Sequence, residues 1–362
     1  MTSPMNVAER LEALCRIDSV IGNEKPLADF LAQRLAEHAP AYELIRVDDN
    51  LVLRPRARVT ERKVVGLVGH LDTVPVSADN PVRVEGDRLY GLGSSDMKSG
   101  DALMWDLLEK PVADPAYDIV AIFYTGEEGD YDQSGLGPTL EQLPWLAETI
   151  DLAICLEPSD NVLQLGCMGT IHAEVNFAGR AAHSARPWQG ENALYKAASL
   201  LSHLAQRKPN DVRFGAEELL YREVLTATLA KGGTARNVVP SSFMVNVNYR
   251  FAPDRSLDSA QKVIRDIVAE HCPVDTDINF TDLSPSGPIP EDNPLLADFK
   301  RKTGVDVAPK QAWTDVARLA AAGIDSINWG PGQNAQAHQP DEWCSLSYLA
   351  EGDRLLRRFL SK

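Results

Sequence analysis

Side chains that bind metals or move protons stand at the ends of three apolar segments of this chain. His70 and Asp72 close the run KVVGLVGHLD. Glu127 and Glu128 close DIVAIFYTGEE, and Glu157 closes DLAICLE. Each run has the length and the β-branched content of a buried strand. Because open parallel sheets bind ligands beyond the carboxyl ends of their strands, these groups should converge, and the pattern predicts a hydrolytic metal site.

The HLD segment allows two interpretations. A single histidine at a strand end, such as His70, is commonly a structural residue held by hydrogen bonds. Asp72 follows two positions later and faces the same side if the strand continues. Since a carboxylate behind a metal-bound imidazole fixes its tautomer, His70 and Asp72 can also be a ligand and its orienting partner.

The glycine-rich segment GLGSSDMKSG, residues 91–100, is typical of a tight turn that opens a helix. It lacks the third glycine of the dinucleotide-binding fingerprint, and no clear strand precedes it. The residue with chemical potential here is Asp96. An aspartate at the start of a helix is often only an N-cap, so the local sequence leaves that alternative open.

Glu127 and Glu128 are adjacent carboxylates at the end of an apolar run. Buried without a cation they would raise each other's pKa, whereas a bound cation reverses that effect. One glutamate can then bind the metal while its neighbour remains a base. The alternative is a solvated acidic loop.

The charges at these positions favour two cations. Glu157 repeats the pattern of an acid after an apolar run, and His338, in AQAHQPDEW, adds a second imidazole. Asp96, Glu128 and Glu157 bring three negative charges. Two divalent cations and one hydroxide would balance them, whereas no cation would leave the acids mutually repelled.

Helical and strand patterns alternate at both ends of the chain. This alternation indicates βαβ units and predicts an α/β fold, with a mostly parallel-sheet catalytic domain that has helices on both faces. Helices are expected over residues 6–18, 25–39, 98–110, 295–303 and 316–322, and strands over 64–69, 118–124, 151–156 and 326–330.

The middle of the chain has another pattern. It reads as strand, helix, strand, strand, helix and strand, over residues 171–177, 192–206, 225–230, 243–251, 258–271 and 277–280. That order is typical of a ferredoxin-like α+β unit. We therefore expect a discontinuous catalytic metal-binding domain, residues 1–168 and 284–362, with a second domain inserted at 169–283.

The composition of the chain limits the classes of partner that it can bind. The 362 residues carry a net charge of −16, which disfavours nucleic acid and anionic membranes because both need a basic face. No apolar run approaches the roughly 18 residues of a membrane span, and the N-terminus shows no leader pattern. The five cysteines form no CxxC pair, so disulfides and a structural zinc are not expected. The chain is expected to be cytoplasmic.

Seven motifs together resemble one enzyme family. In chain order they are HLDTVP, GLGSSDMKSG, TGEEG, LEPS, AAHSARP, GGTARNVVP and AHQPDE. They resemble the two-zinc aminoacylase/carboxypeptidase family of metallohydrolases over nearly the whole chain. Within that family the segments AWTDVARLA and NWGPG are most similar to members that act on N-succinyl-diaminopimelate.

The resemblance implies the metal ligands. His70 and Glu157 would hold one zinc. Glu128 and His338 would hold the other, and Asp96 would bridge both. Ligand sets rich in carboxylates with one histidine per metal suit zinc, but also cobalt or manganese. The family also carries a non-proline cis peptide after the bridging aspartate.

The resemblance also implies three catalytic residues. Glu127 would be the general base, and Asp72 would orient His70. His183, in the inserted domain, would stabilise the oxyanion. In the family it does so across a homodimer interface made by that domain, so an isolated monomer would be inactive.

Substrate contacts are implied at three further positions. Asn237 and Arg250 match inserted-domain residues that contact substrate, and Thr314 matches one near the C-terminus. Here the chain departs from the family, because Ala-Trp-Thr-Asp at 312–315 stands where Gly-Gly-Thr or Gly-Thr-Ser-Asp is common. A guanidinium is the natural partner of a carboxylate, so Arg250 is expected to bind the anionic substrate.

The implied reaction is zinc-dependent hydrolysis of the amide bond of N-succinyl-LL-2,6-diaminopimelate, a small anionic amino-acid derivative. The products are succinate and LL-diaminopimelate, in lysine and diaminopimelate biosynthesis. Deacetylation of acetylornithine and dipeptidase or carboxypeptidase chemistry remain alternatives on the same metal site. A metal-dependent binding protein without enzymatic activity is a further alternative, although no expected ligand is missing.

Overall fold

A computed structural model of the chain describes residues 5–59, 61–75 and 80–362. The expectation about a leader at the N-terminus therefore falls partly outside the described residues. The chain divides into two compact units. Unit 1 comprises Met1–Gly166, Ile289–Ala308 and Arg318–Lys362, and unit 2 comprises Cys167–Pro288 and Pro309–Ala317.

These divisions differ from the expected domain boundaries in one segment. The breaks after residues 166 and 288 fall close to the expected ones after 168 and 283. Pro309–Ala317, however, groups with unit 2, whereas the sequence placed it in the catalytic domain. Thr314 belongs to this segment.

Unit 1 contains a mixed sheet that is parallel at its centre. In the described residues its strand order is β1-β2-β6-β3-β7-β15-β8-β14. β3 pairs in parallel with β6 and β7, and β7 with β15, whereas β1, β2 and β8 form antiparallel pairs. The strands are β1 (Tyr42–Val47), β2 (Asn50–Pro55), β3 (Val64–His70), β6 (Asp118–Tyr124), β7 (Leu152–Cys155), β8 (Leu163–Leu165), β14 (Val307–Pro309) and β15 (Ser326–Asn328).

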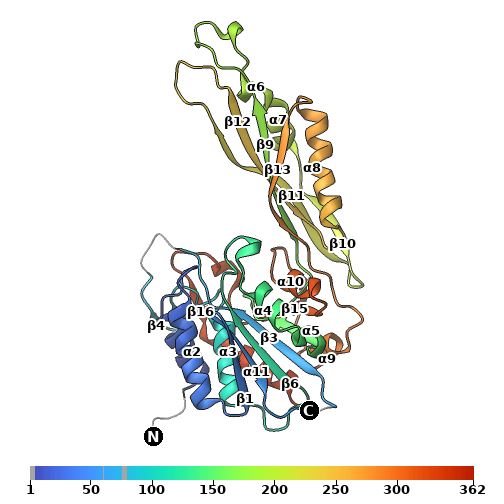
Figure 1. Cartoon of the computed structure of the whole chain (residues 1–362). Helices are drawn as coiled ribbons and strands as arrows, with labels where there is room; N and C mark the ends of the chain where they lie inside the picture. Colours follow the sequence, from blue (N-terminus) through green and yellow to red (C-terminus); the bar gives the residue numbers. More distant parts are fainter. Residues whose placement is uncertain (1–4, 60, 76–79) are drawn as a thin grey trace. The chain divides into compact units, whose positions relative to one another are not determined.

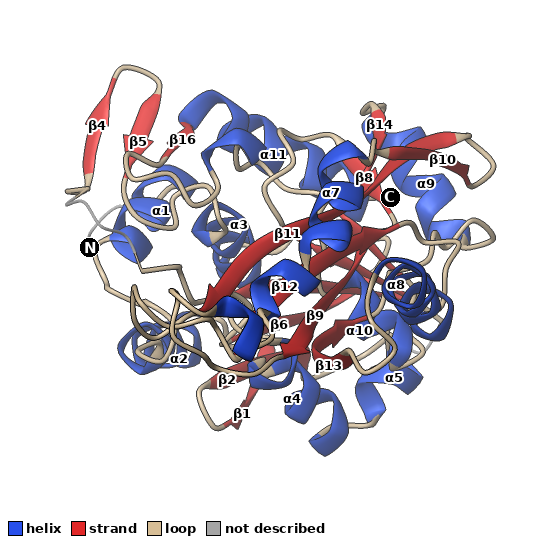
Figure 2. Ribbon diagram, turned by 90° about the horizontal axis from the view of Figure 1, so that it is seen from above, coloured by secondary structure: helices blue, strands red, loops and turns tan. Residues whose placement is uncertain are grey.

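Helices cover both faces of this sheet. α3 and α11 lie on one side and α4 and α5 on the other (Figures 1 and 2). Every residue of β3, β6 and β7 is buried, as parallel strands covered on both faces require. The predicted α/β fold is confirmed. The helices are α1 (Val7–Cys15), α2 (Lys25–His38), α3 (Lys98–Glu109), α4 (Leu136–Gln142), α5 (Trp145–Thr149), α9 (Pro294–Thr303) and α11 (Leu346–Leu360), with α10 (Val316–Ala321) at the boundary with unit 2.

The sequence did not predict every element of unit 1. It missed the antiparallel β1–β2 hairpin, the short strands β8 and β14, the helices α4, α5 and α11, and a small sheet with the order β16-β5-β4. The strands of this sheet are β4 (Arg83–Glu85), β5 (Arg88–Tyr90) and β16 (Trp343–Ser345). The short 3-10 turns η1 (Tyr131–Gln133) and η3 (Asn334–Gln336) complete the unit.

Unit 2 is an antiparallel sheet with helices packed on one face (Figure 1). In the described residues its order is β10-β11-β12-β9-β13, and the last four strands have the arrangement of the predicted ferredoxin-like unit. β10 is an unpredicted edge strand. The elements are β9 (Gly169–Ala178), η2 (Pro187–Gln189), α6 (Ala193–Lys196), α7 (Ala198–Gln206), β10 (Asn210–Phe214), β11 (Leu219–Gly232), β12 (Ser242–Phe251), α8 (Leu257–His271) and β13 (Asp277–Ser284).

Alternation along β9 explains how unit 2 forms its core. Ile171, Ala173 and Val175 are fully buried against α7 and α8. His172 and Glu174, between them, fall on the opposite face because side chains alternate along a strand. Among the described residues, no helix combines the length and the apolar character that crossing a bilayer requires.

Candidate metal centre

The strand ends identified from the sequence meet at one edge of the unit 1 sheet. His70, the last residue of β3, pairs with Tyr124, the last residue of β6. Val68 of β3 pairs with Cys155, the last residue of β7. The parallel register therefore brings the acidic segments after β6 and β7 beside the histidine that ends β3.

Asp96 lies between two histidines. Its Oδ1 is 3.3 Å from Nε2 of His70, and its Oδ2 is 3.7 Å from Nε2 of His338. The same His338 nitrogen is 3.0 Å from Oε2 of Glu128. One carboxylate thus faces both imidazoles, one oxygen to each, which is the arrangement expected of a ligand shared by two cations.

All six acids and histidines expected at the centre come together. They form three overlapping groups, and within each group the possible metal-binding atoms lie within 4.8 Å of one another. The groups are His70 with Glu127 and Glu128, His70 with Asp96 and Glu157, and Asp96 with Glu128 and His338. The second and third groups share Asp96 and together contain the five residues assigned to the metals from the sequence.

The backbone orients His70. Its Nδ1 lies 3.0 Å from the carbonyl oxygen of Asp72, whereas Oδ1 of Asp72 is 3.6 Å away. Because a carbonyl only accepts, Nδ1 carries a hydrogen. Nε2 is therefore the nitrogen that would bind a metal, in place of the proton that it shares with Asp96. The HLD spacing and the family resemblance predicted that the carboxylate of Asp72 orients the imidazole. That carboxylate instead accepts the backbone N–H groups of Glu127 and Glu128, at 3.1 and 2.8 Å.

Asp96 is not the N-cap of the helix that follows it. α3 begins at Lys98, its N-cap residue is Met97, and no side chain caps it. The N-cap alternative is therefore wrong. The peptide bond between Asp96 and Met97 is cis, as the resemblance implied.

His338 has an unusual backbone. Its φ is +62°, in the left-handed region that residues other than glycine rarely adopt. Its imidazole is half-exposed, yet its Nε2 is directed at Glu128. Backbone outliers of this kind persist where surrounding contacts fix them, and they gather at functional sites. The conformation supports a functional role for His338.

Carboxylates raise the pKa of both histidines. Burial lowers the pKa of His70, but the hydrogen bond to Asp96 and the charges of Asp72 and Glu127 outweigh it and raise the pKa well above 6.5. The hydrogen bond to Glu128 raises the pKa of His338 to about 9, against the opposing effect of burial. Acids outnumber bases here, so the centre attracts cations, whether protons or metal ions.

The donor atoms fit a divalent transition metal. The groups offer two imidazole nitrogens and carboxylate oxygens from four acids. Nitrogen and oxygen donors of this kind suit zinc, cobalt and manganese. His70 and Glu157 are buried, and charges held out of water need a counter-charge. A bound cation at this position would supply it.

His183 and Asn237 lie on neighbouring loops of unit 2. Ser184 donates its N–H to the carbonyl of Asn237 at 2.9 Å, and His183 forms a backbone bridge with Val238. Nδ1 of His183 accepts the N–H of Ala185 at 3.1 Å. The neutral imidazole therefore carries its hydrogen on Nε2. Both side chains belong to exposed residues, so Nε2 of His183 can donate to a substrate.

Arg250 and Thr314 lie elsewhere in unit 2. Arg250 is in β12 and pairs with Thr170 of β9, and burial lowers its pKa. Thr314 is buried, and its carbonyl accepts the Sγ–H of Cys167 at 3.5 Å. The hydroxyl of Thr314 has no hydrogen-bond partner among the described residues. Their roles in substrate binding remain predictions.

Two buried acids near the centre were missed from the sequence. Glu342 lies four residues after His338 in AHQPDE, and this position was the signal that could have identified it. Its carboxylate accepts backbone N–H groups of the turn that carries Asp96. Asp101, in the first turn of α3, is fully buried, and burial raises its pKa well above 3.8. Nothing in the local sequence marked Asp101.

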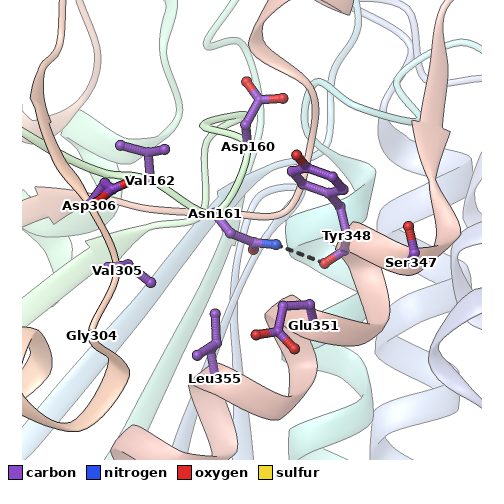
Figure 3. A pocket seen from close by; sticks show the side chains of 10 residues that line it. All are labelled: Asp160, Asn161, Val162, Gly304, Val305, Asp306, Ser347, Tyr348, Glu351 and Leu355. Carbon is purple, nitrogen blue, oxygen red and sulfur yellow. Dashed lines mark hydrogen bonds between the residues drawn. The ribbon is translucent and has the colours of Figure 1, made fainter.

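A separate pocket of about 420 Å³ lies beside the start of α11. Figure 3 shows Asn161 among the residues that line it, and the side-chain amide of Asn161 donates to the carbonyl of Tyr348 at 2.9 Å. Asn161 belongs to the loop that follows Glu157, so this bond ties the loop to α11. None of the described residues that line the pocket belongs to the three metal-binding groups.

Comparison with known sequences gives consistent matches. The model of peptidase family M20/M25/M40 matches residues 66–362. A putative succinyl-diaminopimelate desuccinylase of Mycobacterium tuberculosis is 38% identical over 354 residues, which cover 97% of each chain. The succinyl-diaminopimelate desuccinylase of Corynebacterium glutamicum is 32% identical over 357 residues, which cover 97% of this chain and 95% of that protein.

Solved structures share the fold. A tripeptidase from Staphylococcus aureus superposes with a TM-score of 0.77 at 18% identity, covering 98% of this chain and 96% of that one. A metallo-carboxypeptidase from Sulfolobus solfataricus superposes with a TM-score of 0.74 at 15% identity, covering 99% of each chain. At these identities the likeness concerns the fold alone.

Proposed function

Because the chain belongs to peptidase family M20/M25/M40 and is a metal-dependent amidohydrolase, we propose that it hydrolyses N-succinyl-LL-2,6-diaminopimelate. The products are succinate and LL-diaminopimelate. The observation that carries the proposal is the position of Asp96, with one carboxylate oxygen toward His70 and the other toward His338. Similarity over almost the full length to the mycobacterial and corynebacterial relatives supports the choice of substrate.

The proposed cofactor is a pair of divalent cations, with zinc as the preferred metal. His70 and Glu157 would hold one cation. Glu128 and His338 would hold the other, with Asp96 shared between them. When bound, the cations would polarise the amide carbonyl and lower the pKa of a water molecule toward neutrality.

Glu127 is the proposed general base. Its backbone N–H is fixed by Asp72, and its carboxylate shares a group with His70 and Glu128. Glu127 takes a proton from the attacking water as the oxygen bonds to the acyl carbon. It then passes that proton to the nitrogen as the C–N bond breaks, so that the amine leaves neutral. His183 donates from Nε2 to the oxyanion of the tetrahedral intermediate.

The dimensions of unit 2 support the proposal that His183 acts in the active site of a second subunit. Arg250 pairs with Thr170 near one end of the sheet, and Ser242 pairs with Ala178 at the other. Thr170 and Ala178 are eight positions apart along β9. At about 3.3 Å per residue, the two pairs are therefore about 26 Å apart. His183 lies beyond the far end, so one small substrate cannot touch both His183 and Arg250 of the same chain. A homodimer in which unit 2 reaches the partner's site resolves this.

Arg250 is the proposed anchor for a substrate carboxylate. Partial burial removes water from a guanidinium and strengthens its pairing with an anion. Burial lowers the pKa of Arg250, which is the sign of that desolvation. Thr314 is proposed to contact the remainder of the substrate. Because Asn237 lies beside His183, Asn237 of the partner subunit is proposed to contact it together with that histidine. The enzyme is proposed to act in the cytoplasm.

The test is amine release from N-succinyl-LL-diaminopimelate and N-acetylornithine, measured side by side with added zinc and with chelator. We expect zinc-dependent turnover that strongly favours the succinyl substrate. A preference for N-acetylornithine would reassign the substrate within the family. Turnover of neither, with zinc-dependent cleavage of dipeptides, would replace the proposal with peptidase activity.

A further inference from the structure

We propose that Glu342 is a positioning residue that fixes the turn bearing Asp96, and through it the spacing of the two metal positions. The inference rests on the proposed function, because it takes Asp96 as the ligand shared by two cations. Glu342 itself is not a proposed metal ligand, since it belongs to none of the three metal-binding groups of the described residues.

The carboxylate of Glu342 binds three backbone donors of one turn. Its Oε2 accepts the N–H of Gly93 at 2.7 Å. Its Oε1 accepts the N–H groups of Ser95 and Asp96, at 2.7 and 2.8 Å. Glu342 is only 2% exposed, so water does not compete for these bonds. Burial raises the pKa of Glu342 to about 7, while these backbone N–H groups favour the ionised form. Hydrogen bonds from N–H groups to an ionised carboxylate are short and about twice as strong as neutral ones.

The backbone of the turn directs these three donors to one carboxylate. Gly93 has a φ of +76°, and this left-handed residue helps to direct successive N–H groups toward one point. Without the carboxylate, the buried N–H groups of Gly93 and Ser95 would lose their partners, and a buried unpaired donor is unfavourable. The turn would then relax, and Asp96 would move with it.

Glu342 also links the turn that carries Asp96 to the segment that carries His338. The carbonyl of Glu342 accepts the N–H of Gly91 at 3.1 Å. The hydroxyl of Ser95 donates to the carbonyl of Trp343 at 2.8 Å. The turn before α3 and the segment after His338 are therefore also joined through the backbone of Glu342 and of the residue that follows it. Fixing these loops sets the 3.7 Å separation between Oδ2 of Asp96 and Nε2 of His338.

Three substitutions at Glu342 separate positioning from general stability. Glu342→Ala removes all three acceptors. Glu342→Gln keeps one oxygen for Ser95 and Asp96 but turns an amide toward Gly93. Glu342→Asp keeps the charge on a shorter side chain. The matched control is Glu223→Gln in unit 2, because Glu223 is also buried and its carboxylate accepts a backbone N–H, from Ala252 at 3.1 Å.

The measurements are zinc affinity by competition with a chromogenic chelator, the visible spectrum of the cobalt-loaded protein, and kcat and KM with excess zinc. For Glu342→Ala we expect at least a tenfold loss of affinity at one of two zinc sites and an altered cobalt spectrum. We expect kcat to fall more than KM rises, since the altered part is the metal centre. Glu342→Gln should lie between Ala and the unaltered protein, and Glu223→Gln should lower the Tm without changing zinc affinity.

Zinc affinity within twofold of the unaltered protein in all folded Glu342 variants, with the same cobalt spectrum, would overturn the inference. So would an equal loss of affinity in Glu223→Gln, because the effect would then reflect stability alone. If Glu342→Ala does not fold, the Gln and Asp variants decide. Failure of the proposed function is distinct, because the unaltered protein would then bind fewer than two zinc ions or would not release amine from the succinyl substrate.

Discussion

Glu128 donates its backbone N–H to Oδ2 of Asp72 at 2.8 Å, which fixes the segment after β6 to the segment after β3. The N–H of Glu127 binds Oδ1 of the same carboxylate at 3.1 Å. One buried aspartate thus holds two consecutive acids by their backbones, and the side chain of Glu128 meets His338. This explains how a proposed base and a proposed ligand can be adjacent in the sequence.

Replacement of Asp72 tests this relationship. Asp72→Ala removes both acceptors, so the turn carrying Glu127 and Glu128 loses its anchor. We expect zinc affinity or kcat to fall roughly 10–100-fold, the range typical when residues that support metal ligands are replaced. Asp72→Asn keeps one acceptor oxygen and should lose less. Chelator competition and steady-state kinetics measure both quantities, and equal effects of the two variants would contradict the anchoring role.

Glu127 and Glu128 should separate catalysis from metal binding. Glu127→Ala should retain zinc but lose about 10²–10⁴ in kcat, the contribution typical of a general base. Glu128→Ala should lose zinc as well as activity. Metal content by elemental analysis, together with kcat, distinguishes the two variants. Equal metal occupancy in both variants, with activity intact, would contradict the assignment of Glu127 as the base and Glu128 as a metal ligand.

His338 should make the stability of the metal-free protein depend on pH. Glu128 raises the folded-state pKa of His338 from 6.5 to about 9. A raised pKa stabilises the folded protein fully below pH 6.5, and this stabilisation is lost as the pH rises through 9. The Tm of the zinc-free protein should therefore fall between pH 6.5 and 9.

His338→Gln, which cannot be protonated, is the control for this effect. Its zinc-free form should show a smaller decrease in Tm over the same range. Zinc binding replaces the proton, so the loaded protein should lose the His338 contribution to the slope. An identical slope in the variant and the unaltered protein would show that other groups cause the dependence.

Action of His183 in the partner's site can be tested by mixing two inactive variants. His183→Ala keeps Glu127, and Glu127→Ala keeps His183. If each site takes His183 from the other subunit, a mixed dimer has one complete site, and statistical exchange should restore about a quarter of the unaltered activity. If His183 acts within its own chain, both sites of the mixed dimer are incomplete. No recovery after verified subunit exchange would therefore contradict the proposal.

Local patterns were sufficient to predict much of the fold. The all-buried strands β3, β6 and β7 appeared as short apolar runs, because a strand covered on both faces needs apolar residues at every position. β9 and β12 were recognised as strands because apolar and polar residues alternate along them. In β9 the alternation matches one covered and one more open face, whereas in β12 the polar Asn246 and Asn248 are buried as well. The hairpin β1–β2 and α11 were missed, and the edge strand β10 was not separated from its surroundings.

The site divides in the same way. The sequence predicted that His70, Asp96, Glu128, Glu157 and His338 meet, and the structure brings them together. His70, Glu128 and Glu157 stood out because they follow apolar runs, whereas the ligand roles of Asp96 and His338 came from the family resemblance. It could not identify Asp101 or the role of Glu342, since their surroundings come from segments far away in the chain. Glu342 acts on a turn that lies about 250 positions earlier, a pairing that no local pattern encodes.

The sequence by itself determined which residues could bind metal and which strands would carry them, because burial and side-chain periodicity are local constraints on residue type. Only the tertiary structure decided which hydrogen bonds orient the side chains of the site. In the structure the backbone carbonyl of Asp72 orients the imidazole of His70. The carboxylate of Asp72 instead accepts the backbone N–H groups of Glu127 and Glu128. Hydrogen bonds depend on distances and directions between atoms that meet only after the strands have paired, so residue types alone do not specify them.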